Sequence, residues 1–257
     1  MDMDRKNKIQ SDLYVFPYHY LVDLENKKFN KNLFWGLDYY NYINKVIDLA
    51  TKYIKNDILD LGCGDGFLLY NLKKSYLDKN VNAVGIDIDE KPIKFAQAFS
   101  AGIPNLTFIN QDIQTYNKKF DLITVIETLE HIPDNQISDF IIQIDKHLAN
   151  EGILIISVPS KNVALGKKHY RHYDVDMLKE SFKNYNILET HFVTKKNNFL
   201  YKLTEFLLCN NKVNLNFSIF KKILFLLNKK LFYLVKENEG AHIILVLKNS
   251  SAISSHE

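Results

Sequence analysis

The sequence predicts a doubly wound α/β fold, and three observations lead to that prediction. Short aliphatic runs recur along the chain, among them "DILDLG" from Asp57 and "GILIISV" from Gly152. Amphipathic stretches at helical spacing separate these runs, and both faces of the runs are apolar. A cluster of glycines follows the first run. Strands and helices that alternate in this way form a parallel sheet covered on both sides.

The expected elements follow one another in a regular order. Each strand is a short aliphatic or β-branched run, and each helix has apolar residues at a spacing of three and four. We expect helices at 37–55, 90–101, 136–148 and 174–182, and strands at 57–62, 81–87, 106–110, 120–126, 152–158, 186–193 and 241–248.

Composition limits the classes to which the protein can belong. A net charge of +3 over 257 residues is too mild to favour a nucleic-acid partner. Cys63 and Cys209 lie far apart, so neither a disulfide framework nor a zinc cluster is indicated. The polar N-terminus lacks the apolar core of a signal peptide, and we expect a cytoplasmic location.

The segment "ILDLGCGDG", Ile58 to Gly66, places three glycines at the exit of the first core strand. Ligands of open α/β sheets bind at the carboxyl ends of strands, where glycine lets the backbone approach closely. The spacing G-x-G-x-G differs from the G-x-G-x-x-G of pyrophosphate-binding loops, and Asp60 precedes it. An acid at this position disfavours phosphate and suits a ligand that carries an ammonium group, which argues against a nicotinamide cofactor.

Acidic residues also follow the next two strands. Asp87 ends the second strand, where an acid is placed to hydrogen-bond a ribose diol, and Ile88 beside it can pack on an adenine face. Asp112 and Ile113 follow the third strand, at the position of an adenine edge. Each residue alone is equally typical of a turn or a helix cap, but their order along consecutive strands favours a nucleoside site.

These motifs resemble those of a known family, the class I S-adenosylmethionine-dependent methyltransferases. The segments "LDLGCGDG", "VGIDIDE", "FINQDI", "FDLITVIETLEHI" and "GILIISVPS" stand in family order. The resemblance implies S-adenosylmethionine as the cofactor and a Rossmann-like sheet that ends in an antiparallel strand pair. The cofactor-binding residues implied are Asp60, Gly62, Cys63, Gly64, Gly66, Asp87, Ile88, Asp112, Ile113 and Glu127.

The stretch "VIETLEHIPD", Val125 to Asp134, ends the fourth core strand at the edge that would face the transferred methyl. If its middle is helical, Glu127, Glu130 and His131 fall at i, i+3 and i+4 and could converge on one metal ion or one substrate proton. It is equally the simple end of a buried strand. The string resembles the E-x-x-E-H of ubiquinone-biosynthesis O-methyltransferases and also that of small-RNA 3′-end 2′-O-methyltransferases, in which the two Glu, this His and a later His hold magnesium.

The loop "KKHYRHYD" from Lys167 would supply the second half of such a site. It departs from the loop of the RNA enzymes and looks more like the H-x-R-x-Y loop of methyltransferases from glycan and other small-molecule pathways. We therefore expect no metal, with His131 or His172 as the base. A solvated polar loop is the plainer interpretation. The expected catalytic residues are His131, His172 and Glu130, and the expected substrate contacts in this loop are His169, Arg171 and Tyr173.

Two aromatic segments, "VFPYHYL" and "LFWGLDYY", precede the core. Folded over the cofactor, their rings would shield a sulfonium from water, although ordinary core packing explains them as well. Tyr18, His19 and Tyr20 are the candidate substrate contacts. We expect one methyltransferase domain over 1–257, with an N-terminal aromatic and helical lid at 1–56, a cofactor-binding core at 57–194, a helical insert at 195–240 before the last strand and the last strand at 241–248.

The segment 217–236 is the most apolar part of the chain, but four lysines interrupt it, so it does not span a membrane. A helix there would present an apolar face bordered by cations. Three interpretations stay open: peripheral contact with the inner face of an anionic membrane, a cover for an apolar substrate, or a packed accessory helix.

The expected function is methyl transfer from S-adenosylmethionine to an oxygen of a small molecule or glycan. The alternatives are a metal-dependent RNA 3′-end 2′-O-methyltransferase and a cofactor-binding subunit without catalysis.

Overall fold

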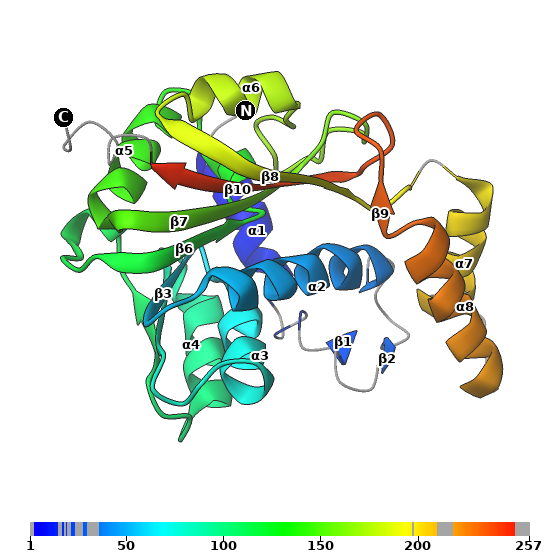
Figure 1. The fold of residues 1–257 in the computed structure, drawn as a ribbon, viewed down its shortest axis with the longest axis horizontal. Helices are drawn as coiled ribbons and strands as arrows, with labels where there is room; N and C mark the ends of the chain where they lie inside the picture. The colour runs from blue at the N-terminus through cyan, green and yellow to red at the C-terminus, as the bar shows by residue number, and fades with distance from the viewer. Residues whose placement is uncertain are drawn as a thin grey trace.

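The computed structural model describes residues 3–14, 17, 19, 22–23, 28–29, 36–196, 198–209 and 218–249. Its centre is an eight-stranded sheet with the order β5-β4-β3-β6-β7-β10-β8-β9 (Figure 1). The first five strands in this order are parallel, whereas β10 is antiparallel to β7 and to β8. The strands are β3 (Asp57–Leu61), β4 (Asn82–Asp87), β5 (Leu106–Asn110), β6 (Phe120–Ile126), β7 (Leu148–Pro159), β8 (Tyr185–Val193), β9 (Leu234–Val235) and β10 (His242–Asn249). The predicted doubly wound fold with a final antiparallel pair is confirmed.

Helices cover both faces of this sheet (Figure 1). Successive strand residues point to opposite faces, so Ile58 packs in one hydrophobic cluster and Leu59 in the other. The first cluster is completed by α2 (Gly36–Tyr53), α3 (Phe67–Ser75) and α4 (Glu90–Ser100), and the second by α5 (Ile137–His147) and α6 (Val175–Ser181). The two-sided burial explains why the strands read as continuous aliphatic runs.

The segments on either side of the core hold more structure than the sequence indicated. A first helix, α1 (Met3–Leu13), and a short strand pair, β1 (Val22–Asp23) and β2 (Lys28–Phe29), were not expected. The predicted insert contains α7 (Phe199–Cys209) and α8 (Ser218–Leu231), and it also adds β9 to the sheet beside β8. Among the described helices, none combines the length and the apolar character needed to cross a bilayer.

Buried amides attach the insert to the start of α2. The Asn41 side chain donates to Thr194 Oγ1 at 3.2 Å and to Asn228 Oδ1 at 3.4 Å, and Asn228 Nδ2 donates back to Asn41 Oδ1 at 2.9 Å. The rings of Tyr40 and Phe225 pack edge to face beside them, with centroids 4.9 Å apart. The amino-terminal end of α2 is thereby held between the insert and the edge of the sheet where the candidate site lies.

Candidate active site

A cleft of about 1330 Å³ runs along the carboxyl ends of the parallel strands. Most of the residues selected from the sequence line it: Asp60, Gly62, Cys63, Gly64, Asp87, Ile88, Asp112, Ile113, Glu127, Glu130, His131, His169 and His19. Tyr18 and Tyr20 lie outside the described residues. Gly66, Arg171, His172 and Tyr173 are described but are not among the residues that line the cleft.

The glycine loop needs residues without a side chain at two positions of the cleft wall. Gly62 and Gly64 have positive φ angles of 79° and 53°. A Cβ on Gly62 would lie 2.5 Å from Thr128 Oγ1, and one on Gly64 would lie 2.5 Å from the Tyr14 hydroxyl. Both glycines line the cleft, and the close approach of Thr128 and Tyr14 leaves no space for a side chain at either position.

Gly66 serves packing rather than the ligand. Its φ angle is 77°, and a Cβ there would lie 2.5 Å from Phe108 Cζ and 2.8 Å from Ala96 Cβ. The glycine lets α3 begin close against β5 and α4. This placement corrects the expectation that Gly66 surrounds the cofactor, because the third glycine of the motif faces the core.

Asp87 is fixed at the end of β4 by two backbone donors. Its Oδ2 accepts from the Gly64 N–H at 2.9 Å, and its Oδ1 accepts from the Asp89 N–H at 2.9 Å. Burial raises the pKa of Asp87. Each carboxylate oxygen keeps acceptor capacity, so two adjacent hydroxyls can donate to it.

The part of the cleft wall next to Asp87 combines apolar side chains with a carboxylate that caps a short helix. Ile88 is 73 % exposed at the cleft, and Ile113 is buried beneath it. Asp112 accepts from the Gln114 N–H at 2.9 Å and so caps the short 3₁₀ helix Ile113–Thr115. The wall therefore offers the apolar side chain of Ile88 and the carboxylate of Asp112 to a ligand.

Asp60 lies under the glycine loop at the end of β3. Thr124 Oγ1 donates to Asp60 Oδ1 at 2.7 Å, and burial raises the pKa of Asp60 to about 7. A cation bound beside this carboxylate would favour its charged form, since opposite charges at short distance stabilise each other.

His19, a candidate substrate contact, lies against the glycine loop. Its Nδ1 lies 2.8 Å from Asp65 Oδ1, and its backbone N–H donates to Asp65 Oδ2 at 3.3 Å. The ring packs against Tyr39, with centroids 4.8 Å apart. His19 therefore lies beside the glycine loop, in the part of the cleft where the sequence places the cofactor.

Helix α1 bridges the cleft between its two walls. Lys6 donates to the carbonyl of His169 on one side, and Lys91 Nζ donates to the Ser11 carbonyl at 3.2 Å on the other. Residues of this helix also line the cleft. Helix α1 thus lies in the region 1–56 for which a helical lid was predicted, although the sequence indicated a helix only from residue 37.

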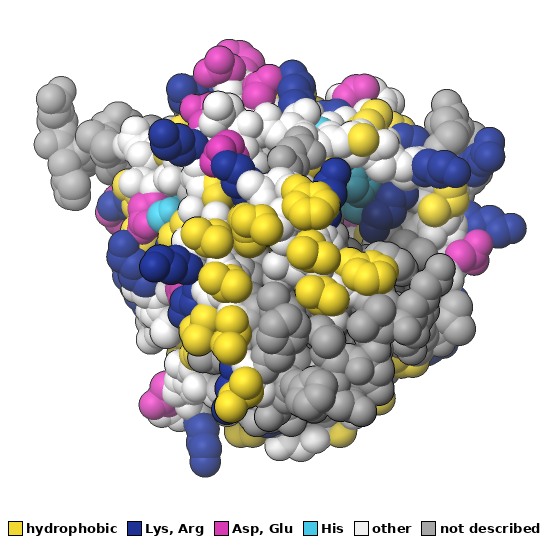
Figure 2. Space-filling model, turned by 90° about the vertical axis from the view of Figure 1, so that its right-hand side faces the viewer, with side chains coloured by type: hydrophobic (Ala, Val, Ile, Leu, Met, Phe, Trp, Pro, Cys, Tyr) yellow, Lys and Arg dark blue, Asp and Glu magenta, His cyan; other side chains and the backbone are white. Residues whose placement is uncertain are grey.

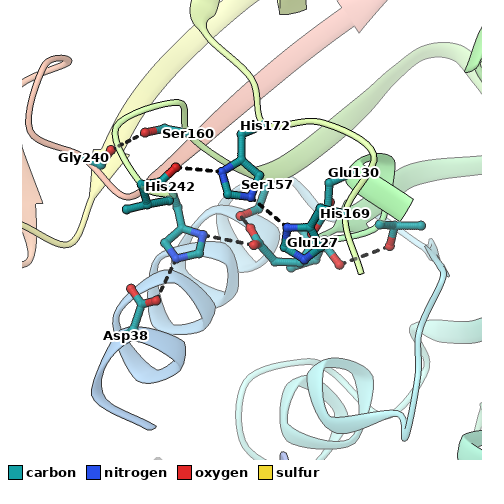
Figure 3. Close-up of polar contacts among 12 residues, drawn as sticks. Asp38, Glu127, Glu130, Ser157, Ser160, His169, His172, Gly240 and His242 are labelled. Carbon is teal, nitrogen blue, oxygen red and sulfur yellow. Dashed lines mark hydrogen bonds and ion pairs between the residues drawn. The ribbon is translucent and has the colours of Figure 1, made fainter. Parts of the chain in front are cut away.

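A buried row of three charged side chains closes the floor of the cleft (Figure 3). His242 Nε2 lies 3.0 Å from Asp38 Oδ2, and His242 Nδ1 lies 3.0 Å from Glu127 Oε2. Ser157 Oγ donates to Glu127 Oε1 at 2.6 Å, and Lys196 pairs with Asp38. The row joins α2, the end of β6 and the start of β10.

These contacts set the charges of the row. Burial alone would lower the pKa of His242, but the two carboxylates outweigh it and raise the pKa to about 10. Burial opposes the ionisation of Asp38 and Glu127, yet His242 keeps the pKa of both carboxyls below the ordinary value. An imidazolium between two carboxylates is therefore the stable form at neutral pH. The sequence reasoning missed Asp38 and His242, because nothing in the string links them.

The segment Val125 to Asp134 makes a sharp turn and does not form the helix that one interpretation of the sequence required. Glu127 has a φ angle of 51°, and only Leu129–His131 form a 3₁₀ turn. The Glu127 carboxylate pairs with His242 and Ser157, and it does not belong to the close group of ligand atoms from Glu130, His131 and His169. The i, i+3, i+4 convergence of all three residues does not occur.

Three histidines form a chain that leads into the cleft, and Figure 3 shows two of them, His172 and His169. His172 Nδ1 lies 3.1 Å from the Val163 carbonyl, and His172 Nε2 lies 2.8 Å from His169 Nδ1. A carbonyl only accepts, so His172 Nδ1 carries a proton and His169 Nδ1 must donate to His172 Nε2. In the neutral chain the free lone pair is on His169 Nε2. His131 packs edge to face on His169, with centroids 4.9 Å apart.

Burial keeps this part of the cleft short of charge. It lowers the pKa of His169 to about 4, helped by Lys168, and it lowers the pKa of His131 well below its ordinary value. Burial and the Glu127 carboxylate raise the pKa of Glu130 well above its ordinary value, and Glu130 Oε2 has no hydrogen-bond partner. One ligand atom each of Glu130, His131 and His169 lies within 4.8 Å of the others. The cluster is a neutral polar pocket with an unsatisfied carboxyl group.

Arg171 and Tyr173, which flank His172 in the loop, contact the 3₁₀ turn Leu129–His131. Arg171 Nε donates to Asp134 Oδ1 at 2.7 Å, and its guanidinium also donates to the Leu129 carbonyl at 3.1 Å. Tyr173 is buried in the core and donates to the same carbonyl at 3.3 Å. Arg171, His172 and Tyr173 therefore orient the 3₁₀ turn and His169. Direct catalytic or substrate contact was expected of these residues. The contacts instead favour a positioning role, because Arg171 and Tyr173 bond to the turn at Leu129 and His172 bonds to His169.

Comparison with known proteins identifies the family. The model of a methyltransferase domain matches residues 55–207. A ubiquinone biosynthesis O-methyltransferase from Photorhabdus laumondii is 28% identical over 100 residues, 37% of this chain and 40% of that protein. A cyclopropane-fatty-acyl-phospholipid synthase from Escherichia coli K12 is 30% identical over 109 residues, 42% of this chain and 28% of that protein. Both matches span less than half of the relative's length.

A similar fold occurs in a solved structure. Magnesium protoporphyrin IX methyltransferase from Synechocystis PCC 6803, with bound S-adenosylmethionine, superposes with a TM-score of 0.59 at 16% identity, covering 97% of this chain and 98% of that one. The chain belongs to the class I S-adenosylmethionine-dependent methyltransferases, as the motif order indicated. S-adenosylmethionine is the cofactor of this class.

Replacement of Asp87 by alanine should weaken binding of S-adenosylhomocysteine on the order of a hundredfold. The reason is the loss of hydrogen bonds from a ribose diol to a charged acceptor, each of about 1.5–3 kcal/mol. Isothermal titration measures the change. Asp121→Ala is the control, since Asp121 accepts from the Asn56 N–H at the opposite end of the sheet. Equal affinities of the two variants would disprove the ribose assignment.

The charge on His242 should make stability depend on pH in the alkaline range. Its folded pKa of about 10 exceeds the ordinary 6.5, so its contribution is full below pH 6.5 and is lost as the pH rises to 10. The difference in unfolding free energy between wild type and His242→Gln should shrink over that interval, as measured by urea denaturation.

His191→Gln provides the matched control for this titration. Burial lowers the pKa of His191, so its contribution does not change above pH 7. A difference for His242→Gln that is as flat as that for His191→Gln would show that the buried imidazole is neutral.

Proposed function

We propose that this protein transfers the methyl group of S-adenosylmethionine to a hydroxyl oxygen of a small molecule or glycan. The observation that carries the proposal is the histidine chain, which presents an unprotonated nitrogen to the cleft at His169. When bound, S-adenosylmethionine supplies an electrophilic methyl on a sulfonium. The protein then has to align the acceptor and remove its proton.

The order of the strands separates a cofactor half from an acceptor half. Going across the sheet, the ends of β5, β4 and β3 carry Asp112, Asp87 and Asp60, which suit adenine, ribose and the charged methionine portion in that order. The next strand is β6, and beyond it lie Glu130 and His169. A methyl leaving the methionine end therefore meets an acceptor held by these residues.

The residues of the cofactor half fit the proposed ligand. The oxygens of Asp87 keep acceptor capacity for a diol, and Gly62 and Gly64 place backbone along the cleft wall. The buried carboxyl of Asp60 would become charged beside a cation. A phosphate-bearing ligand would face these acids at short range, which is unfavourable.

His169 is the proposed general base. With the cofactor bound, the methyl–sulfur bond would break with its electron pair left on the sulfur of the departing S-adenosylhomocysteine, and the acceptor oxygen would bond to the methyl carbon. The proton of the acceptor hydroxyl would pass to His169 Nε2, while His172 holds the ring through Nδ1. A pKa of about 4 makes His169 a weak base. Within the proposed substrate classes this favours an acidic, phenol-like hydroxyl over a sugar hydroxyl. His131 packs on the same ring and would contact the acceptor from the side.

His169→Gln should lower kcat on the order of a hundredfold or more and leave the affinity for S-adenosylhomocysteine unchanged, because general-base catalysis is lost while the cofactor half is intact. Homocysteine release from a panel of hydroxylated acceptors measures turnover. His191→Gln is the control, since its side chain pairs with Glu189 on β8 and does not line the cleft. Full activity of His169→Gln would exclude the proposed base.

A second candidate function has one specific observation in its favour. The ligand atoms of Glu130, His131 and His169 are grouped closely enough for a divalent cation, and Glu130 Oε2 lacks a partner. Such a cation would polarise an acceptor hydroxyl directly, as in the RNA 3′-end alternative. The group differs from the set inferred from sequence, because Glu127 is engaged with His242 and Ser157.

Methyl transfer to small-molecule acceptors should survive treatment with a chelator, because the proposed base is a side chain. The assay follows homocysteine release with and without EDTA, and RNA with free 3′ ends is offered as a separate acceptor. Activity that is abolished by EDTA and restored by Mg²⁺ or Mn²⁺, with transfer to RNA, would establish the second candidate instead.

A further inference from the structure

Helices α7 and α8 carry most of the exposed apolar surface of the described chain. Sixteen large hydrophobic side chains are exposed among the described residues, and ten of these lie within 199–234. Figure 2 shows hydrophobic side chains gathered on the face of the molecule that carries this helical pair, with lysines around them. The ten are Phe199, Leu200, Leu203, Phe206, Ile219, Ile223, Leu226, Leu227, Leu231 and Leu234, and we call them the apolar face.

The apolar face is distinct from the side by which the helices pack on the protein. Tyr201 of α7 and Phe225 of α8 are buried, and Asn228 reaches the amide pair with Asn41. The opposite side of a surface helix is ordinarily polar. Here Phe199, Leu203 and Phe206 fall at i, i+4 and i+7 and form a second apolar stripe, on the outside.

Lysines border this surface almost without acids. Between residues 198 and 235 the sequence holds six lysines and one acid, Glu205, so six minus one gives a local charge of +5. The side chains of Lys202, Lys222, Lys229 and Lys230 are exposed. An apolar stripe flanked by cations is the pattern of a helix that lies in a lipid interface.

We propose that the apolar face binds the surface of an anionic lipid bilayer, with its Leu, Ile and Phe side chains at the acyl boundary and its lysines at the headgroup phosphates. Neither helix is long and apolar enough to span the bilayer, so the contact is parallel to its surface. The inference is independent of the acceptor proposed above.

Two other occupants fit the observations less well. A second copy of the chain would pack face to face by two-fold symmetry and would bring two sets of lysines together, which is repulsive. A substrate held by the face alone would lie outside the cleft, because none of the described residues in 198–235 lines it. An anionic surface satisfies both the apolar stripe and the charge.

Co-sedimentation of the full chain with lipid vesicles tests the proposal. Vesicles of phosphatidylcholine with phosphatidylglycerol should bind the protein at least about tenfold more strongly than vesicles of phosphatidylcholine alone, and high salt should weaken binding. Leu226→Asp combined with Lys229→Glu should abolish it. Both side chains are exposed, so the variant should keep its affinity for S-adenosylhomocysteine.

Ile142→Asp combined with Lys146→Glu is the matched control, because both residues are exposed on α5, on the other face of the sheet. This control should bind vesicles like the wild type. Failure to sediment with phosphatidylglycerol vesicles at low salt, or equal loss in both double variants, overturns the proposal. A dimer in sedimentation equilibrium that only the Leu226→Asp, Lys229→Glu variant dissolves would assign the face to a second copy.

Discussion

The arrangement of the site depends on one buried charge, the imidazolium of His242 between Asp38 and Glu127. Taking three ionised groups out of water is costly, and the cost is offset only where each charge has a partner at hydrogen-bonding distance. Here both distances are 3.0 Å. The partners come from the second helix, the fourth strand of the parallel set and the last strand of the chain, so the row can form only when these distant segments are assembled. It also holds the Glu127 carboxylate charged at the end of β6, beside the place where a sulfonium is proposed.

The histidine chain differs from this charged row, because it remains neutral. A backbone carbonyl fixes the proton on His172, and each ring then fixes the tautomer of the next, until His169 is left with an open lone pair. Glu127 separates the two networks. The Glu127 carboxylate pairs with the His242 imidazolium, and its negative charge helps to keep Glu130 protonated. One carboxylate thus stabilises the charge of His242 and helps to keep Glu130 uncharged.

The sequence predicted the parts of the fold that are local and repetitive. The aliphatic runs, the glycine loop and the acids after each strand are visible as strings, because burial on both sheet faces and the turn after each strand act on neighbouring residues. The sequence did not predict the role of Gly66, since its reason is Phe108, over forty positions away. The pairing of Asp38 with His242 could not be predicted for the same reason, since the two residues lie far apart in the sequence. The sequence left open whether Glu127, Glu130 and His131 converge, and the positive φ angle of Glu127, which is not helical, decides against convergence.

The insert and the charged row share the amino-terminal end of α2, which gives the proposed membrane contact a route to the cleft. Asn41 ties this end to α8 through Asn228, while Asp38, three positions earlier, pairs with both Lys196 and His242. A shift of α8 on a bilayer would therefore act on a residue that lines the cleft. Because buried ion pairs tolerate little change in distance, such a shift would either be resisted or would alter the partner of His242. Asn41 and Asn228 are both buried, so a hydrogen bond lost between them would leave a buried polar group without a partner.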